Sequence, residues 1–138
     1  ILAGQRKGGR PRIFLIYSAG NFIEATRDTP FLQIGEHKYG KPILERVLTP
    51  QTTLAQAAKC ALLSFDGTIK ANLSVAPPID VLIYKADTLA IGRQQEIAAG
   101  DPYFATLSAG WGTGLLKVFA DLADPPWTAD DAAPGESG

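Results

Sequence analysis

Several residue types are scarce in this 138-residue sequence, and each scarcity excludes a class of protein or site. Cys60 is the only cysteine and His37 is the only histidine. One cysteine cannot form a disulfide within the chain, which is compatible with a reducing compartment. One histidine cannot build a metal site from several histidines, and a Ser-His-Asp triad would depend on a single loop position. We therefore expect no metal and no cofactor.

Methionine is absent, and the first residue is Ile1. A native translation product begins with methionine, so we expect either that the chain was processed or that a segment upstream of it is missing. The chain does not open with basic residues followed by an apolar run, so the sequence contains no recognisable secretory leader.

The sequence also lacks an excess of charge of one sign, because 13 Lys and Arg are balanced by 14 Asp and Glu, for a formal net charge of −1. This balance lacks the positive surface that binds nucleic acid or an anionic membrane. Apolar runs such as Ile13–Tyr17 are far shorter than the ~20 residues that cross a bilayer. We expect no nucleic-acid partner, no membrane partner and a cytoplasmic location.

Two groups of strands are predicted from β-branched, aromatic and alternating residues. The second group opens with a nearly continuous apolar strand, which we expect to be central and covered on both faces. In the first group, the first two strands form a hairpin and the second and third are antiparallel neighbours. The predicted strands are Ile1–Gln5, Arg12–Ala19, Asn21–Thr26 and Phe31–Ile34, then Ile79–Tyr84 and Thr88–Gln95.

Three helices are predicted between and after these strands. The first covers Lys41–Leu48, with proline in its first turn. The second begins at a capping box formed by Thr53 and Gln56 and ends at Asp66-Gly67. The third follows Asp101-Pro102 and continues to Leu122, weakened by three glycines that each cost up to ~1 kcal/mol. The expected core positions of the second helix are Leu54, Ala58, Ala61 and Phe65.

The order of these elements predicts an α+β fold with an antiparallel sheet and segregated helices. We expect residues 1–124 to form part of one domain. Residues 125–138 are small, acidic and without apolar periodicity, so we expect a disordered tail.

Long strings of residues resemble one protein family. Asn21–Thr26, Phe31–Arg46 and Ser64–Val75 followed by Pro78–Asp80 are similar to signatures of Anbu, the bacterial proteasome-type peptidase also called the ancestral β subunit. The resemblance extends from about residue 1 to about Leu122. Gly67 and Ala76 depart from the family pattern, which usually has a small polar residue and a glycine at these positions.

This resemblance implies an N-terminal nucleophile hydrolase with the four-layer αββα sandwich of proteasome β subunits, of which the chain supplies roughly the C-terminal half. Such enzymes hydrolyse peptide or amide bonds with a chain-terminal Thr, Ser or Cys, whose own amine is the general base. Ile1 has no hydroxyl or thiol, so we expect no peptidase activity from this chain alone.

The implied partners are the missing N-terminal half of the same protein, further copies in a homo-oligomer, and a peptide or protein substrate. An isolated half-sandwich leaves an apolar sheet face that must be covered. One alternative is a non-catalytic module kept for self-assembly. Another is a small-ligand binding domain of a different fold.

The resemblance also suggests site residues. Asp66 is the candidate that orients the nucleophile's amine, with a polar residue after it that is Thr68, Asn72 or Ser74. Glu36, after Gly35, stands where classical subunits have serine, and it could be catalytic. The structural alternatives are that Asp66-Gly67 is a helix-ending turn and that Glu36 is a solvated ion-pair partner of Lys38.

Other noticeable residues have ordinary structural interpretations. We expect His37 in an exposed loop, Cys60 as a buried unreactive thiol, and Trp111 in the core or a subunit interface. Asp80 opens a strand and could pair with a Lys or Arg from a neighbour, which is a structural interpretation. The glycines at 110, 112 and 114 lie within a helical pattern and lack the strand and Lys-Ser/Thr of a phosphate-binding loop.

Overall fold

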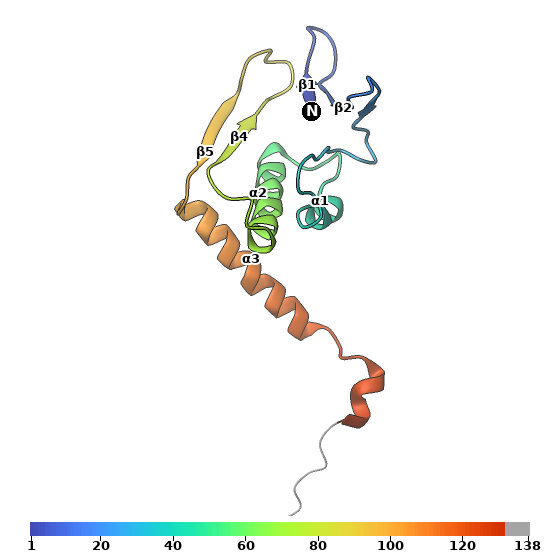
Figure 1. The fold of residues 1–138 in the computed structure, drawn as a ribbon, viewed down its shortest axis with the longest axis vertical. Coiled ribbons are helices and arrows are strands. Elements are labelled where there is room, and N and C mark those ends of the chain that lie inside the picture. Colours follow the sequence, from blue (N-terminus) through green and yellow to red (C-terminus); the bar gives the residue numbers. More distant parts are fainter. Residues whose placement is uncertain (132–138) are drawn as a thin grey trace, which may run out of the picture.

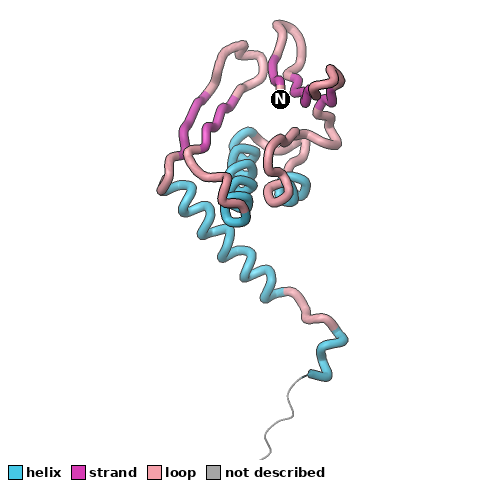
Figure 2. Tube along the Cα trace, in the orientation of Figure 1, coloured by secondary structure: helices cyan, strands magenta, loops and turns pink. Residues whose placement is uncertain are grey.

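The structure is a computed structural model that describes residues 1–131. Two small antiparallel sheets lie at one end of the molecule, and the helices lie below them (Figures 1 and 2). The longest helix, α3, runs away from the sheets toward the opposite end. In chain order the elements are β1 (Leu2–Gly4), β2 (Arg12–Ile16), β3 (Phe22–Glu24), α1 (Lys41–Val47), α2 (Leu54–Ala71), β4 (Ile79–Ile83), β5 (Arg93–Ile97), α3 (Pro102–Asp121) and a 3-10 helix (Pro126–Asp131).

The first sheet has the order β1-β2-β3 and is antiparallel throughout, which confirms the predicted hairpin and its neighbour. Phe14 on β2 packs edge-on against Phe22 on β3, with ring centroids 5.6 Å apart. The guanidinium of Arg12 lies 4.6 Å from the Phe14 ring centre and donates two hydrogen bonds to the Glu24 carboxylate, at 2.8 and 2.6 Å. These contacts hold β2, the central strand, against β3.

The predicted strand Phe31–Ile34 is wrong, because this segment is an irregular loop. It finds no strand partner among the described residues. Leu32 and Gln33 instead line a hollow beside α1 and α2.

The second sheet consists of β4 and β5, with Ile79 opposite Ile97. The partner strand begins at Arg93 rather than Thr88, because Asp87 and Leu89 have positive φ angles of 68° and 48° and form a wide loop before it. In the described chain β4 pairs only with β5. The expectation of a central strand covered on both faces is therefore not met within this chain, and Leu82 is exposed.

The second helix starts as predicted, because Thr53 Oγ1 accepts from the Gln56 backbone N–H and Gln56 Oε1 accepts from the Thr53 backbone N–H. It does not end at Asp66-Gly67 but continues to Ala71. The extra turn buries Thr68 and places Ile69 against the core. The free energy gained from this packing outweighs the low helix propensity of Gly67.

The predicted buried stripe of α2 is also wrong, since Leu54 and Phe65 are 50% and 41% exposed. The buried side chains of this helix belong to neighbouring positions, because α2 is contacted from two sides, by α1 and by α3 with β4. They are Cys60, Leu62, Leu63, Ser64, Asp66 and Thr68.

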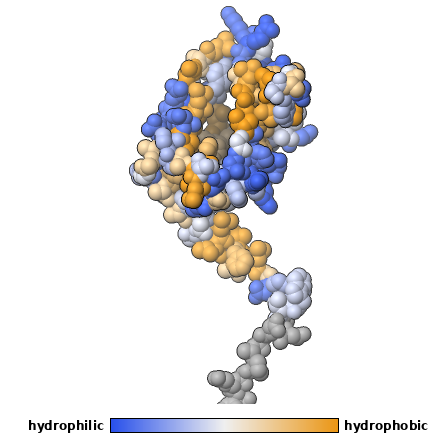
Figure 3. Space-filling model, in the orientation of Figure 1, coloured by the Kyte–Doolittle hydropathy of each residue, from blue (hydrophilic) through white to orange (hydrophobic). Residues whose placement is uncertain are grey.

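The buried core is small and lies where α2 meets the second sheet and α3. Leu62, Ile79 and Ile97 form its centre, and four half-buried apolar residues pack around them: Ile69, Val81, Phe104 and Leu107. Many large apolar side chains on β1–β3 and α3 remain exposed (Figure 3). The described part of the chain contains no helix with the length and apolar character needed to cross a membrane.

The side chain of Gln5, in the loop after β1, connects the first sheet to the loop between β4 and β5. Its Oε1 accepts from the Tyr84 hydroxyl at 2.7 Å and from the Asp87 backbone N–H at 2.8 Å. Its Nε2 donates to Asp87 Oδ1 at 2.6 Å. These hydrogen bonds attach the first hairpin to the loop between β4 and β5, although among the described residues no strand of one sheet pairs with a strand of the other.

Part of the tail that we expect to be disordered, residues 132–138, lies outside the described residues. Within the remainder, Pro126–Asp131 forms the 3-10 helix and Trp127 is exposed.

Candidate functional site

Asp66 is buried in the second half of α2. Its Oδ2 accepts from Lys70 Nζ at 2.8 Å, one turn further along the helix. Lys70 also donates to Ser108 Oγ on α3 at 3.0 Å. The interpretation of Asp66-Gly67 as a helix-ending turn is therefore wrong, and in this chain Asp66 takes part in the contact between two helices.

Thr68 faces the other side of α2. Two residues correspond to a rotation of about 200° around a helix, so Thr68 and Asp66 point in nearly opposite directions. The Thr68 hydroxyl donates to the backbone carbonyl of Ser64 at 2.8 Å. Gly40 approaches this point so closely that a Cβ there would collide with Ser64 Oγ and lie 2.9 Å from Thr68 Oγ1. Glycine at position 40 lets the loop before α1 lie directly on Ser64 and Thr68.

Glu36 is held by the residues that follow α2. Its Oε2 accepts from Asn72 Nδ2 at 3.2 Å. Asn72 Oδ1 in turn accepts from the backbone N–H and the hydroxyl of Ser74, at 2.9 and 2.7 Å. Among the described residues Glu36 has no ion pair with Lys38, so that interpretation is wrong. Thr68, Asn72 and Ser74 were the three candidates for the polar site residue that follows Asp66. Two of them are linked to Glu36: Asn72 directly, and Ser74 through Asn72.

Glu36 and Thr68 line one hollow of about 430 Å³ between the loop before α1, α1 itself and α2. Gln33 lines it too, and its Oε1 is buried without a hydrogen-bond partner within the described part of the chain. A buried carbonyl oxygen without a donor is rare in native proteins and costs free energy. The hollow therefore offers the Glu36 carboxylate as an acceptor to a donor from outside this chain, whereas Gln33 Oε1 is closed off from solvent.

The structure brings together Glu36, Thr68, Asn72 and Ser74 at this end of α2, and it leaves Asp66 on the opposite face. Two participants, Gln33 and Gly40, were not predicted. Gln33 lies in a segment that resembles a strand, and the need for glycine at position 40 arises from a contact with a helix more than 20 residues later. No local signal in the sequence marks either residue.

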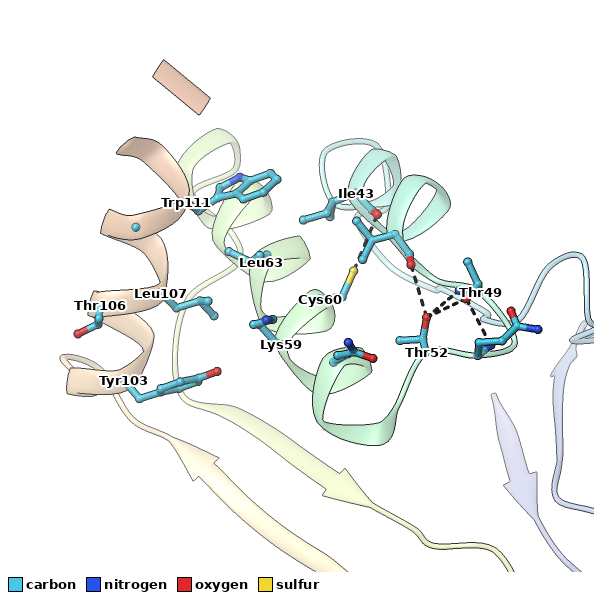
Figure 4. A pocket seen from close by; sticks show the side chains of 14 residues that line it. Ile43, Thr49, Thr52, Lys59, Cys60, Leu63, Tyr103, Thr106, Leu107 and Trp111 are labelled. Atoms are coloured by element: carbon cyan, nitrogen blue, oxygen red, sulfur yellow. Dashed lines mark hydrogen bonds between the residues drawn. The ribbon is translucent and has the colours of Figure 1, made fainter. Parts of the chain in front are cut away.

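A larger groove, of about 760 Å³, lies between α1, α2 and α3 (Figure 4). Tyr103, Leu107 and Trp111 form its α3 wall, and Cys60 and Leu63 lie at the α2 side. Burial raises the pKa of the Cys60 thiol, which lies 3.8 Å from the carbonyl oxygen of Ile43. The predicted burial of Cys60 is confirmed.

Three further predictions can be compared with the structure. His37 is exposed in a loop, as predicted. Trp111 is 37% exposed and lies outside the buried core. Asp80 is exposed opposite Glu96 on β5, and the possible pair with a Lys or Arg is not formed among the described residues.

Comparison with known proteins finds no matching family model and no matching curated protein. Solved structures match strongly. Anbu from Hyphomicrobium sp. strain MC1 is 54% identical with a TM-score of 0.86, over 89% of this chain and 53% of that chain. Anbu (ancestral β subunit) from Yersinia bercovieri is 52% identical with a TM-score of 0.84, over 89% and 52%. The helical assembly of the Anbu complex from Pseudomonas aeruginosa is 49% identical with a TM-score of 0.86, over 92% and 53%. The chain spans about half the length of these relatives.

Proposed function

Because the chain belongs to the Anbu family, we propose that it is the C-terminal half of a proteasome-type hydrolase subunit. In this proposal the complete subunit is an αββα sandwich of the N-terminal nucleophile class and hydrolyses peptide or amide bonds in proteins or peptides. The main support is the match at 49–54% identity over about nine tenths of this chain.

The nucleophile would be a Thr, Ser or Cys at the start of the N-terminal half. Its α-amino group takes the proton from the hydroxyl or thiol during attack and returns it to the leaving amine. Ile1 offers no such group. We therefore propose that this chain alone is inactive and that activity requires both halves.

The hollow at the end of α2 is our candidate for the place where this amine binds. An amine offers N–H donors, and the hollow presents the Glu36 carboxylate as an acceptor for them. Asn72 and Ser74 hold the Glu36 carboxylate in one orientation. Thr68 adds a hydroxyl at the wall of the hollow. Glu36 would act as a catalytic residue through contact with the amine, and Asn72 would act as a positioning residue.

Asp66 remains a second candidate for orienting the amine. Its burial and its hydrogen bond to Lys70 would hold a carboxylate in a defined place. It lies away from the hollow, however, so the two candidates make different predictions. Contact with the amine at Glu36 requires the N-terminal half to enter the hollow, whereas a role for Asp66 requires it to reach the α2–α3 contact.

The proposal is tested by hydrolysis of a panel of fluorogenic peptide amides. The complete protein should be active, and the 138-residue chain alone should show no hydrolysis. Glu36→Gln in the complete protein should lower kcat at least tenfold, and Asp66→Asn tests the alternative. Glu45→Gln, which changes an exposed glutamate on α1, is the matched control and should leave kcat unchanged. Hydrolysis by the chain alone, or full activity in both Glu36→Gln and Asp66→Asn, would overturn the proposal for this site.

The second candidate function is a non-catalytic module that has been retained for self-assembly. The observation that favours it is the amount of exposed apolar surface on β1–β3 and α3. A complete protein that assembles normally but hydrolyses no member of the panel would support this alternative.

A further inference from the structure

The groove between α1, α2 and α3 has no part in the proposed hydrolysis, yet it has the features of a small-molecule site. Its volume of about 760 Å³ falls within the range of about 300–1,000 Å³ that is typical of such sites. The residues that line it belong to the three helices and to the loop between α1 and α2. The walls of the groove are therefore built entirely by this chain.

One end of the groove is apolar. Figure 4 shows Ile43, Leu63 and Trp111 around this end, one from each of the three helices. Gly110 lines the groove too, and a Cβ built there meets nothing within 4 Å. Glycine weakens a helix interior, and at this position the missing side chain leaves the groove open. This end offers room and apolar contacts to the hydrophobic part of a ligand.

The other end of the groove presents hydrogen-bond donors. Lys59 lies one turn before the apolar end on α2, and Figure 4 shows the hydroxyl of Tyr103 pointing from α3 toward α2. Gln56 lines the groove one turn before Lys59. Its Oε1 already accepts from the Thr53 backbone N–H, so its Nε2 is left as a donor. An ammonium, a hydroxyl and an amide N–H can therefore all donate to one ligand group.

The charge of the groove selects the sign of that ligand group. Among the described residues that line the groove, Lys59 is the only charged residue and none is Asp or Glu. Lys59 forms no ion pair with a carboxylate in the described part of the chain. A cation would be repelled here, whereas a carboxylate accepts several hydrogen bonds and gains a charge-assisted one from Lys59.

The length of the groove selects the size of the apolar part. Tyr103 and Trp111 are eight residues apart on α3, which corresponds to about 12 Å along the helix. An extended chain of about ten carbons has this length, at ~1.3 Å per bond. We propose that the groove binds a medium-chain fatty acid, with its carboxylate at Lys59 and Tyr103 and the end of its chain beside Trp111. This inference goes beyond the proposed function and does not depend on it.

The first experiment is calorimetric titration of decanoate into the complete protein and into the 138-residue chain. We expect one decanoate per chain with a dissociation constant below about 1 mM in both. Octanoate should bind about tenfold more weakly, because it buries two fewer methylene groups. Decylammonium, which has the same chain length and a positive head, should not bind detectably.

Two other outcomes of this titration would overturn the proposal. Uptake of several decanoates per chain would show that the exposed apolar surface takes them up without a specific site. Binding to the 138-residue chain but not to the complete protein would show that the rest of the subunit fills the groove.

Two matched pairs of variants locate the binding. Lys59→Gln should raise the dissociation constant of decanoate at least tenfold, whereas Lys117→Gln, which removes the same charge outside the groove, should leave it unchanged. Gly110→Leu should abolish binding by filling the groove. Gly112→Leu is its control, because a Cβ at Gly112 also meets nothing within 4 Å but Gly112 does not line the groove. Far-UV circular dichroism verifies folding, and equal effects within either pair would contradict the proposed site.

The orientation of the ligand can be read from fluorescence. The chain has two tryptophans, so Trp127→Phe leaves Trp111 as the only one. Decanoate with bromine on its terminal carbon should quench Trp111 more strongly than decanoate with bromine beside the carboxylate. Equal or reversed quenching would refute the proposed orientation. Peptide hydrolysis is measured separately, so failure of this site and failure of the proposed enzyme activity can be told apart.

Discussion

The carboxylate of Asp66 and the ammonium group of Lys70 lie 2.8 Å apart on consecutive turns of α2, with Asp66 buried and Lys70 largely in water. Lys70 extends the contact to Ser108, so one cation joins a buried anion to the next helix. A buried carboxylate is costly without such a partner. The pair therefore explains how a charged residue is accommodated inside the helical layer.

The first prediction follows from this pair. Lys70→Met should lower the free energy of unfolding by about 1 kcal/mol, because it leaves the Asp66 carboxylate buried without its cation and removes the hydrogen bond to Ser108. Lys41→Met breaks the exposed pair with Glu45, which has the same helical spacing, and should cost at most about 0.5 kcal/mol. Urea unfolding of both variants measures the difference. Equal effects would contradict a special role for the buried pair.

Two glycines should respond to alanine in opposite ways. Gly40→Ala forces a methyl group onto Ser64 Oγ and Thr68 Oγ1, and we expect a loss of about 2 kcal/mol from overpacking. Gly112→Ala adds a methyl group in open space on α3 and should stabilise the chain by about 0.5–1 kcal/mol through helix propensity. Thermal unfolding at low protein concentration compares the two. A stable Gly40→Ala variant would show that the loop before α1 can move away from α2.

Hydrogen bonding from Arg12 lowers the pKa of Glu24. A carboxylate whose pKa is lower in the folded state stabilises the fold above its unfolded pKa, about 4.3, and this contribution is lost as the pH falls through the lower, folded value. As the pH falls from about 5 through the folded pKa of Glu24, the wild type should therefore lose more stability than Glu24→Gln. The difference in stability loss between the wild type and Glu24→Gln should be smaller in high salt, because the Arg12–Glu24 ion pair is exposed and salt screens it. Denaturant unfolding at several pH values tests this, and parallel pH profiles would contradict it.

The thiol of Cys60 should react slowly with thiol reagents at neutral pH, since burial both raises its pKa and blocks access. We expect its modification by a disulfide reagent to accelerate at least a hundredfold in concentrated guanidinium. The unfolded chain is the internal control, because it contains the same single thiol. Rapid modification of the native chain would show that α1 opens away from α2.

Features that depend on neighbouring residues were predictable from the sequence. The capping box of Thr53 and Gln56, the first hairpin and the start of α3 at Asp101 each depend on side chains within a few residues of one another. The end of α2 was missed because Gly67 is a local stop signal that distant packing overrides. The family was recognisable because long strings of residues are shared with it.

The candidate site was predictable only in part. Glu36 and Thr68 were named as candidate residues, and their roles remain predictions, but the hollow that they share depends on contacts between segments more than 30 residues apart. The partner of Glu36 is Asn72 rather than the adjacent Lys38, and Gln33 carries no sequence signal. Asp66 was chosen through the family resemblance, and the sequence also allowed a helix-ending turn there, which the structure contradicts because α2 continues to Ala71.

The bridge formed by Gln5 has a consequence for the order of folding. Gln5 and Asp87 are separated by 82 positions in the sequence, so their contact closes a long loop and carries a large entropic cost that local contacts avoid. The α1–α2 pair and the β4–β5 hairpin need only nearby segments. We expect them to form early, and the first hairpin to be fastened to the second sheet in one of the last steps.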